Sequence, residues 1–254
     1  MNTFEEIRAL LIAEFIKLKR TPVLWMSLAA PLFAVTVAFI ASLTSGHKFY
    51  QPGVNPWTDF SAHILVGWAL FVFPIYVCLQ TALYSSLEHN TNGWSYLATL
   101  PVGKHSLIVS KYCWAVLMVA VSQVLLVVLT WVSGWLLAIL KPSYGFQDYP
   151  MTMMPAEACL WVFLSGLTII AIQMLLSILF RSFVIPTGAG LIFVLGGVIA
   201  RSLTVSIYWP FLWPILLLNN TPHSAQWRLT FGAAGTACFL IVSMFSIMQF
   251  GRTK

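Results

Sequence analysis

The sequence has very little charge: only 8% of its 254 residues are Asp, Glu, Lys or Arg. A soluble domain of this size cannot cover its surface with so few charged side chains, so this shortage excludes a soluble globular protein. The apolar share of 59% and the mean hydropathy of +0.87 point the same way. The sequence therefore predicts an all-α integral membrane protein that crosses the bilayer several times.

The chemistry of ATP hydrolysis is also missing. No phosphate-binding loop of the form Gly-x-x-x-x-Gly-Lys-Ser/Thr occurs, because Gly103-Lys104 is followed by His105 and lacks the preceding glycine pattern. The five histidines are scattered and do not pair at a spacing that suits zinc or haem. We therefore predict no catalytic residue, no metal ligand and no cofactor in this chain.

Cysteine is scarce as well, and it shows no pattern. Four cysteines occur, each within or at the edge of an apolar segment: Cys78, Cys113, Cys159 and Cys238. None has the spacing of a metal site, so all four are expected to pack as small apolar residues.

Ionisable residues are nearly absent from the interior of the apolar segments. The exceptions lie at or near segment ends: His63, Lys111, Glu157 and Arg201. The polar residues in the middle of the membrane are amides such as Gln123 and Gln173. Proton-coupled transporters need buried carboxylates, His or Lys. The pattern thus argues against a proton-driven pump, while sodium sites made of backbone and hydroxyl oxygens stay open.

The first segment, Thr3 to Arg20, has the pattern of an amphipathic helix. Apolar side chains recur at spacings of three and four residues: Phe4, Ile7, Leu11, Phe15 and Leu18. Such a helix is expected to lie in the membrane interface, with its basic end on anionic headgroups.

Six apolar segments are long enough, or nearly so, to cross the membrane. They are approximately residues 22–43, 60–86, 107–140, 157–180, 183–200 and 229–250. The third would measure roughly 50 Å against a hydrocarbon core of about 30 Å, so part of it should extend into the cytoplasm unless Gly134 breaks it. The stretch 207–218 is too short to cross and contains Pro210 and Pro214. It predicts a re-entrant outer hairpin over residues 204–227.

The positions of Lys and Arg indicate the orientation of these spans. With six spans and both termini inside, nine basic residues face the cytoplasm and four face outward. This asymmetry favours a cytoplasmic location for both termini. We treat residues 1–254 as one transmembrane domain, in which residues 1–20 connect to the first span.

One substantial polar loop, residues 87–106, lies on the predicted cytoplasmic side. Asn90 to Asn92 favour the start of a helix, and that helix should end before Pro101. Two helical turns are unstable alone in water, so the segment needs a surface to pack on. It is either a membrane-surface helix with its aromatic side chains among the headgroups or a docking site for a cytoplasmic partner.

The combination of a basic interfacial helix, six spans, this loop and the outer hairpin resembles the permease subunits of ABC-2-type exporters. The resemblance is carried by three local matches: Glu14 to Thr21 before the first span, Glu88 with Trp94 to Lys104 and Lys111, and the Trp-Pro hairpin at 209–214. Chain length and the Glu-Phe-x-Lys-Leu-Lys-Arg start are most similar to the small permeases of bacteriocin and lantibiotic immunity. The family's loop often opens with alternating Glu and Arg, whereas this one has Glu88-His89-Asn90, so the resemblance gives no support for salt bridges there.

The resemblance implies a separate cytoplasmic ATPase subunit that binds ATP and docks on the loop. The residues implied in this coupling are Glu88, Trp94, Tyr96, Leu97, Leu100, Pro101 and Lys104. It also implies a second permease copy or a sibling permease, and a location in the bacterial cytoplasmic membrane. The implied activity is export of an amphipathic peptide, a drug or a lipid-like compound, and no nucleic acid is expected as a partner.

The aromatic residues of the outer hairpin have two interpretations. Trp209, Pro210, Trp213 and Pro214 form either an outer gate through which substrate leaves or part of the aromatic belt at the headgroups. Two other classes of function also stay open. One is a non-transporting membrane sensor or assembly protein. The other is a lipid-modifying enzyme, although the outer acidic residues are too few and too scattered to support it.

Overall fold

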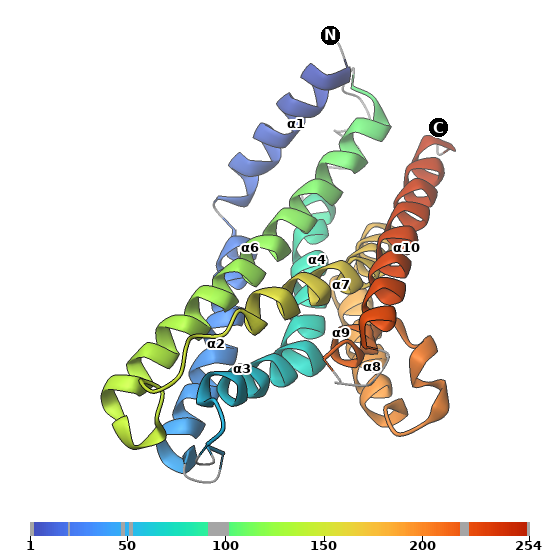
Figure 1. Ribbon diagram of the computed structural model, residues 1–254. Coiled ribbons are helices and arrows are strands. Elements are labelled where there is room, and N and C mark those ends of the chain that lie inside the picture. Colours follow the sequence, from blue (N-terminus) through green and yellow to red (C-terminus); the bar gives the residue numbers. More distant parts are fainter. Residues whose placement is uncertain are drawn as a thin grey trace.

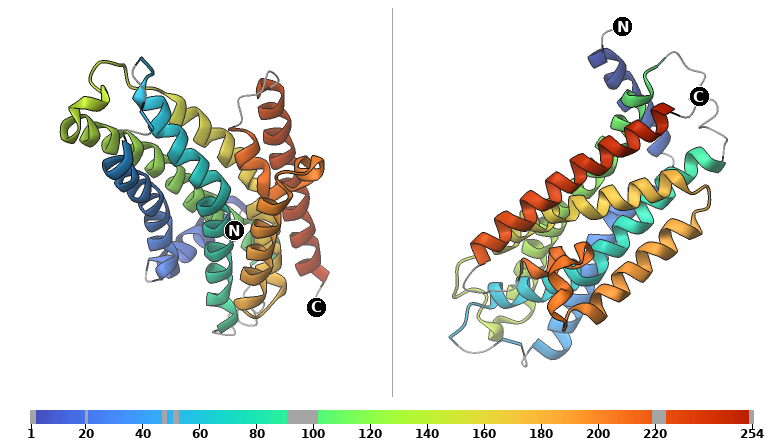
Figure 2. Two further views of the ribbon diagram at one scale, coloured as in Figure 1. Left: turned by 90° about the horizontal axis from the view of Figure 1, so that it is seen from below. Right: turned by 90° about the vertical axis from the view of Figure 1, so that its right-hand side faces the viewer.

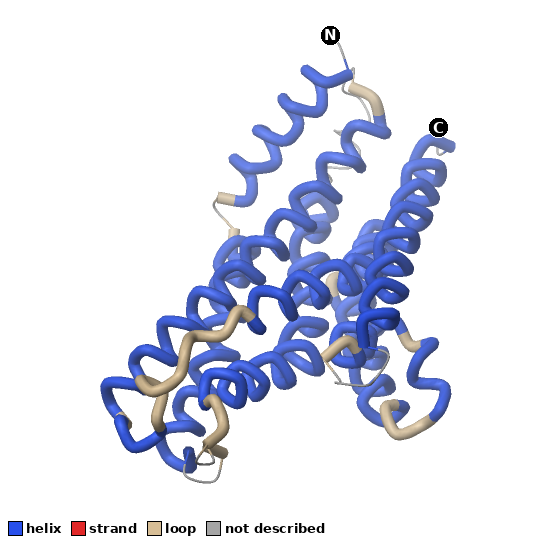
Figure 3. The backbone as a smooth tube through the Cα atoms, in the orientation of Figure 1, coloured by secondary structure: helices blue, strands red, loops and turns tan. Residues whose placement is uncertain are grey.

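The computed structural model describes residues 3–19, 21–46, 49–50, 53–90, 102–218 and 224–252. These residues form helices and connecting loops, without a strand in the described ranges (Figure 3). The α-helices are α1 (Thr3–Leu18), α2 (Pro22–Ser45), α3 (Pro56–Gly67), α4 (Phe73–Asn90), α6 (Lys104–Leu140), α7 (Met154–Leu179), α8 (Val184–Ala200), α9 (Trp213–Leu216) and α10 (Ser224–Arg252) (Figure 1). A π-helix, Trp68–Val72, joins α3 to α4, and 3₁₀ turns cover Pro142–Tyr144, Thr204–Tyr208 and Pro210–Leu212.

Four helical stretches in the described part of the chain are long and apolar enough to cross a membrane. They are Pro22–Ser45, Pro56–Asn90, His105–Leu140 and Met154–Leu179. Two further apolar helices are shorter, Val184–Ala200 and Leu229–Phe245. The prediction of an all-α, multi-pass membrane protein is confirmed, while the count of six spans stays a prediction.

The second predicted span is longer than expected and bent. It runs without a break from Pro56 to Asn90, and α3 and α4 point in different directions (Figure 1). The bend falls at the π-helix, directly before Pro74. Proline has no N–H to donate, and its ring collides with the carbonyl four residues earlier, so widening the preceding turn relieves the clash.

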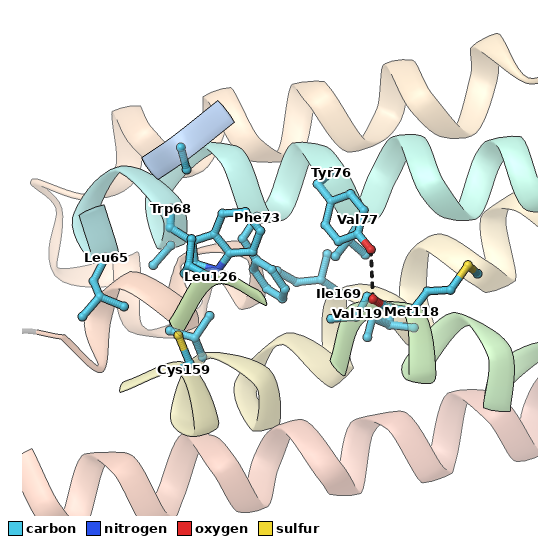
Figure 4. Packing of buried hydrophobic residues seen from close by; sticks show 14 of the residues in the cluster. Leu65, Trp68, Phe73, Tyr76, Val77, Met118, Val119, Leu126, Cys159 and Ile169 are labelled. Atoms are coloured by element: carbon cyan, nitrogen blue, oxygen red, sulfur yellow. Dashed lines mark hydrogen bonds between the residues drawn. The ribbon is translucent and has the colours of Figure 1, made fainter. Parts of the chain in front are cut away.

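The bend lies in the centre of the hydrophobic core. Trp68 and Phe73 are fully buried there, and the indole N–H of Trp68 donates to Gln123 Oε1 on α6 at 3.1 Å. Figure 4 shows both rings beside Leu126 of α6 and Cys159 of α7, with Tyr76 donating to the Met118 carbonyl at 3.3 Å. The bent helix is thus held against both α6 and α7.

Gly134 does not break the long helix α6. The helix has 37 residues, which corresponds to about 55 Å. A Cβ atom at Gly134 would lie only 2.4 Å from the ring of Trp57, so the glycine allows α3 and α6 to approach closely. The indole N–H of Trp57 donates to the Phe146 carbonyl at 2.9 Å and holds the loop after α6 against α3.

The structure also bears on two further predictions from the sequence, the first helix and the packing of the cysteines. The first helix is confirmed, and α1 packs alongside the first turns of α6 (Figure 1), while its orientation in a membrane interface stays a prediction. Cys78 and Cys159 are buried as expected, but Cys113 is exposed. Cys238 is partly buried, and Cys113 lies on an exposed side of the apolar helix α6, so packing of these two as small apolar residues stays a prediction.

Candidate functional site

Side chains from α1, α4 and α6 meet in a buried ion-pair cluster. Its members are Glu14, Lys17, Tyr84, Glu88 and Lys111. Lys111 Nζ lies 3.1 Å from Glu14 Oε1 and 3.0 Å from Glu88 Oε1. Lys17 Nζ lies 3.2 Å from Glu14 Oε1 and 2.9 Å from Glu88 Oε1. Each ammonium thus bridges the same two carboxylates.

The cluster forms because the face of α1 that packs on α6 contains both apolar side chains and the carboxylate of Glu14. Glu14 follows Ile7 and Leu11 at helical spacing and precedes Leu18, so packing this apolar stripe carries the carboxylate inside. Trp114 of α6 donates its indole N–H to the Leu11 carbonyl at 2.9 Å. The ring of Phe15 stacks on Trp114 with centroids 5.4 Å apart. These contacts fix the position of α1 along α6.

The charges of the cluster are balanced and mostly removed from solvent. The side chain of Lys111 is 1% exposed and that of Glu14 is 3% exposed, whereas that of Lys17 is 39% exposed. Buried charges are tolerated only when paired and hydrogen-bonded. Tyr84 meets part of this requirement by donating its hydroxyl to Glu14 Oε2 at 2.7 Å.

The surroundings of Lys17 keep it protonated. Burial of the ammonium lowers its pKa, but the hydrogen bond to Glu88 and the charges of Glu14 and Glu88 act in the opposite direction, and the net pKa is raised. A raised pKa leaves Lys17 positively charged at any physiological pH. Lys17 therefore places a positive charge against the carboxyl groups of Glu14 and Glu88.

Helix α1 contacts both ends of the segment 91–101. Glu88, which pairs with Lys17, lies at the end of α4, just before this segment begins. After the segment, the backbone N–H of Gly103 donates to Glu6 of α1. The same end of α4 is tied to α7, since His89 Nε2 lies 3.1 Å from the Ser177 carbonyl oxygen. The residues that flank segment 91–101 are therefore linked to α1 and α7.

The coupling residues predicted from the sequence fall into three groups. Glu88 lies in the cluster and forms two salt bridges, which the resemblance had not supported. Lys104 is the first residue of α6. The others lie outside the described residues: Trp94, Tyr96, Leu97, Leu100 and Pro101.

Sequence reasoning missed the cluster as a unit. It did not predict that Glu14, Lys17, Tyr84 and Lys111 meet, and it placed Lys111 at the end of a span. One signal in the sequence could have revealed it. Glu14 lies within the apolar stripe of the first helix, and a carboxylate that is buried with such a stripe needs a partner from another helix.

The predicted outer residues lie toward the opposite end of the bundle from the cluster (Figure 1). The indole N–H of Trp209 donates to the Phe193 carbonyl of α8 at 2.8 Å, and its ring lies against Gly196 and Gly197. Trp213 donates to the Ile207 carbonyl at 2.9 Å, and its ring is 5.5 Å from that of Phe231 on α10.

The two prolines shape this short connection. Pro210 begins a 3₁₀ turn and Pro214 lies in the first turn of α9. The connection packs on α7 and α8 and follows the end of α8 (Figure 2). It thus contacts three helices, α7, α8 and α10.

Comparison of the sequence with known protein families identifies one match. A family profile described as "ABC-2 family transporter protein" matches residues 10–197, a range that includes every residue of the ion-pair cluster. No curated protein and no solved structure matches the chain. Permeases of this family are the membrane-spanning part of ABC transporters and generally work with an ATPase subunit. Because the match covers most of the sequence, the chain belongs to the ABC-2 transporter family and is a transmembrane subunit of an ABC transporter.

Proposed function

We propose that the chain is the permease subunit of an ATP-driven exporter in the bacterial cytoplasmic membrane. It crosses the membrane six times with both termini in the cytoplasm, and residues 204–227 form a re-entrant outer hairpin. A separate ATPase binds ATP and docks on residues 87–106, and a second copy or a sibling permease completes the pathway. The cargo is amphipathic or hydrophobic, such as a bacteriocin or lantibiotic peptide, a drug or a lipid-like compound.

The ion-pair cluster is the observation that carries this proposal. It joins the helices on both sides of segment 91–101, so force applied there by a partner reaches α1, α4 and α6 together. Helix α6 then extends about 55 Å to the loop that Trp57 holds. A rigid helix of this length can transmit a cytoplasmic movement to the outer side.

Replacing Leu97 with aspartate tests the docking of the ATPase. In the proposed complex, Leu97 is buried against the partner, and burying a carboxylate in an apolar contact is strongly unfavourable. We expect the variant to lose ATPase copurification and ATP-dependent export while the isolated permease keeps its melting temperature. Both properties can be measured on tagged protein expressed with the neighbouring ATPase gene.

Ser182→Asp is the matched control, because it adds the same charge at an exposed position between α7 and α8, outside residues 87–106. It should retain the partner and full export. If Leu97→Asp also retains both, residues 93–100 are a membrane-surface anchor, and the docking part of the proposal is wrong.

Substitution of the outer tryptophans tests the gate. Trp209 packs on α8 and Trp213 on α10, so together they link the two helices that flank the hairpin. We expect Trp209→Ala and Trp213→Ala to lower resistance to an exported amphipathic compound, with the larger loss in the double variant. Expression and ATPase binding should not change.

Two comparisons separate a gate from an aromatic belt. Trp209→Phe keeps the ring but removes the N–H that bonds to Phe193, so it should give an intermediate loss. Trp25 of α2 is 68% exposed and represents a belt position. If Trp25→Ala lowers resistance as much as Trp209→Ala, the hairpin tryptophans act only as a belt.

A further inference from the structure

Three neighbouring helices, α4, α7 and α8, carry buried polar atoms that are unpaired in the described part of the chain. Gln173 of α7 is 0% exposed, and neither its amide oxygen nor its amide nitrogen has a hydrogen-bond partner in the described part of the chain. The same holds for the hydroxyls of Ser85, Ser177 and Thr187. We call these four residues, Ser85, Gln173, Ser177 and Thr187, the polar seam.

The members of the seam lie on facing sides of their helices. A Cβ atom at Gly190 of α8 would lie 2.4 Å from both Gln173 Nε2 and Cys78 Sγ, so the three helices meet at this glycine. Thr187 precedes Gly190 by one helical turn and so lies on the same face of α8. Figure 2 shows α4, α7 and α8 side by side.

The serines extend the seam toward the ion-pair cluster. Ser177 follows Gln173 by one turn of α7, and its carbonyl oxygen lies 3.1 Å from His89 Nε2 of α4. Ser85 precedes His89 by one turn and so faces the same way along α4. The unpaired polar residues thus recur along neighbouring turns of α4, α7 and α8.

A primary amide sealed in a helix bundle without a partner is unfavourable, because it has lost its hydrogen bonds to water and gained none in return. Apolar side chains at these positions would give a more stable closed bundle. Helix α8 meets the seam with little side-chain volume at Gly190, against which Gln173 and Cys78 pack. The seam therefore has donors and acceptors available to bond to another molecule.

We propose that the polar seam binds uncharged hydrogen-bonding groups of the transported molecule, such as peptide amides or hydroxyls, and that α8 closes over them. Gln173 supplies both a donor and an acceptor, which matches one peptide group of a cargo. The absence of a charged side chain in the seam fits a cargo that offers neutral polar groups along an apolar body. This inference rests on the proposed transport function and names the cargo chemistry that the membrane part recognises.

Native Cys78 allows a binding measurement without the ATPase. The test uses the full chain in lipid nanodiscs, with alanine in place of Cys113, Cys159 and Cys238, and follows the labelling of Cys78 by N-ethylmaleimide. We expect an uncharged dansyl-trileucine amide to slow this labelling, whereas a dansyl-dodecyl probe without backbone amides should not. Gln173→Leu should raise the concentration of trileucine probe needed for half-protection about tenfold.

The matched control is Gln123→Leu. Gln123 is also a buried amide, but it accepts from Trp68 outside the seam, so this variant should leave the half-protection concentration unchanged. In addition, Gln173→Leu should raise the melting temperature, because it removes an unpaired buried amide. Equal protection by the two probes, or an equal loss of protection in the two variants, overturns the proposal.

A reversible clamp gives a second measurement that does not depend on the Gln173 variant. A Cβ atom at Gly190 would lie 3.0 Å from Cys78 Cβ, slightly under the separation in a disulfide. Oxidised Gly190→Cys should therefore join α8 to α4 and abolish fluorescence of the bound trileucine probe, and a reductant should restore it. Binding to the oxidised form contradicts closure by α8. Neither measurement requires a partner subunit, so failure of the transport proposal and failure of the seam proposal give different results.

Discussion

Replacing Lys111 with methionine is expected to lower the free energy of unfolding by about 3–5 kcal/mol and to abolish export. Lys111 is the most buried ammonium of the ion-pair cluster and bridges both carboxylates. Its loss leaves Glu14 and Glu88 close together, with only the half-exposed Lys17 to balance them. Unfolding of the purified protein in mixed micelles, followed by tryptophan fluorescence, measures this change.

Two variants separate the cluster from a general effect of losing a lysine. Lys19 is exposed at the end of α1, so Lys19→Met should change the free energy of unfolding by well under about 1 kcal/mol. The double variant Glu14→Gln with Lys111→Met removes one charge of each sign and should recover part of the stability lost by Lys111→Met alone. An equal loss in Lys19→Met and Lys111→Met would show that the cluster does not stabilise the fold.

Gly235→Val is expected to separate α10 from α7 and to destabilise the protein by about 3 kcal/mol or more. A Cβ atom at Gly235 would lie 2.2 Å from the backbone oxygen of Leu164 and 3.0 Å from Ser165 Cα. A backbone cannot rotate aside as a side chain can, so the two helices themselves must move apart. Small residues allow such close helix contacts in membranes, where packing rather than the hydrophobic effect holds helices together.

Ala233→Val is the matched control, because it places the same side chain on an exposed face of the same helix. The melting temperature of each purified variant and its elution by size exclusion report the effect. Ala233→Val should behave as the parent. A Gly235→Val protein with the parental melting temperature would show that α7 and α10 do not pack at this glycine.

Most helices could be predicted from the sequence because a membrane requires long apolar runs with internally satisfied backbones. The predicted span 22–43 corresponds to Pro22–Ser45, and the predicted span 183–200 to Val184–Ala200. The π-helix at Trp68–Val72 was not predicted. Pro74 indicates that the helix is distorted nearby, but the sequence does not specify whether the helix kinks, breaks or widens by one residue per turn. The close contacts of Gly134 and Gly235 also depend on how helices distant in sequence lie together.

The candidate site was predicted only in part, for a similar reason. Glu88 was identified through the family resemblance of the polar loop, but its partners Lys17 and Lys111 come from two other helices. Periodicity places a residue on a face of its own helix and carries no information about the helix that will cover that face. The raised pKa of Lys17 follows from these partners and so could not be predicted either.

The long separation between the partners in the cluster has a consequence for biosynthesis. Glu14 and Lys111 are 97 residues apart, so at roughly 5–20 residues per second the ribosome adds Lys111 about 5–20 s after Glu14. During that time the carboxylate of Glu14 has no partner from α6, and water is the only environment that favours it. We therefore expect the newly made α1 to stay in contact with water until α6 is available, so the cluster closes late in the folding of the subunit.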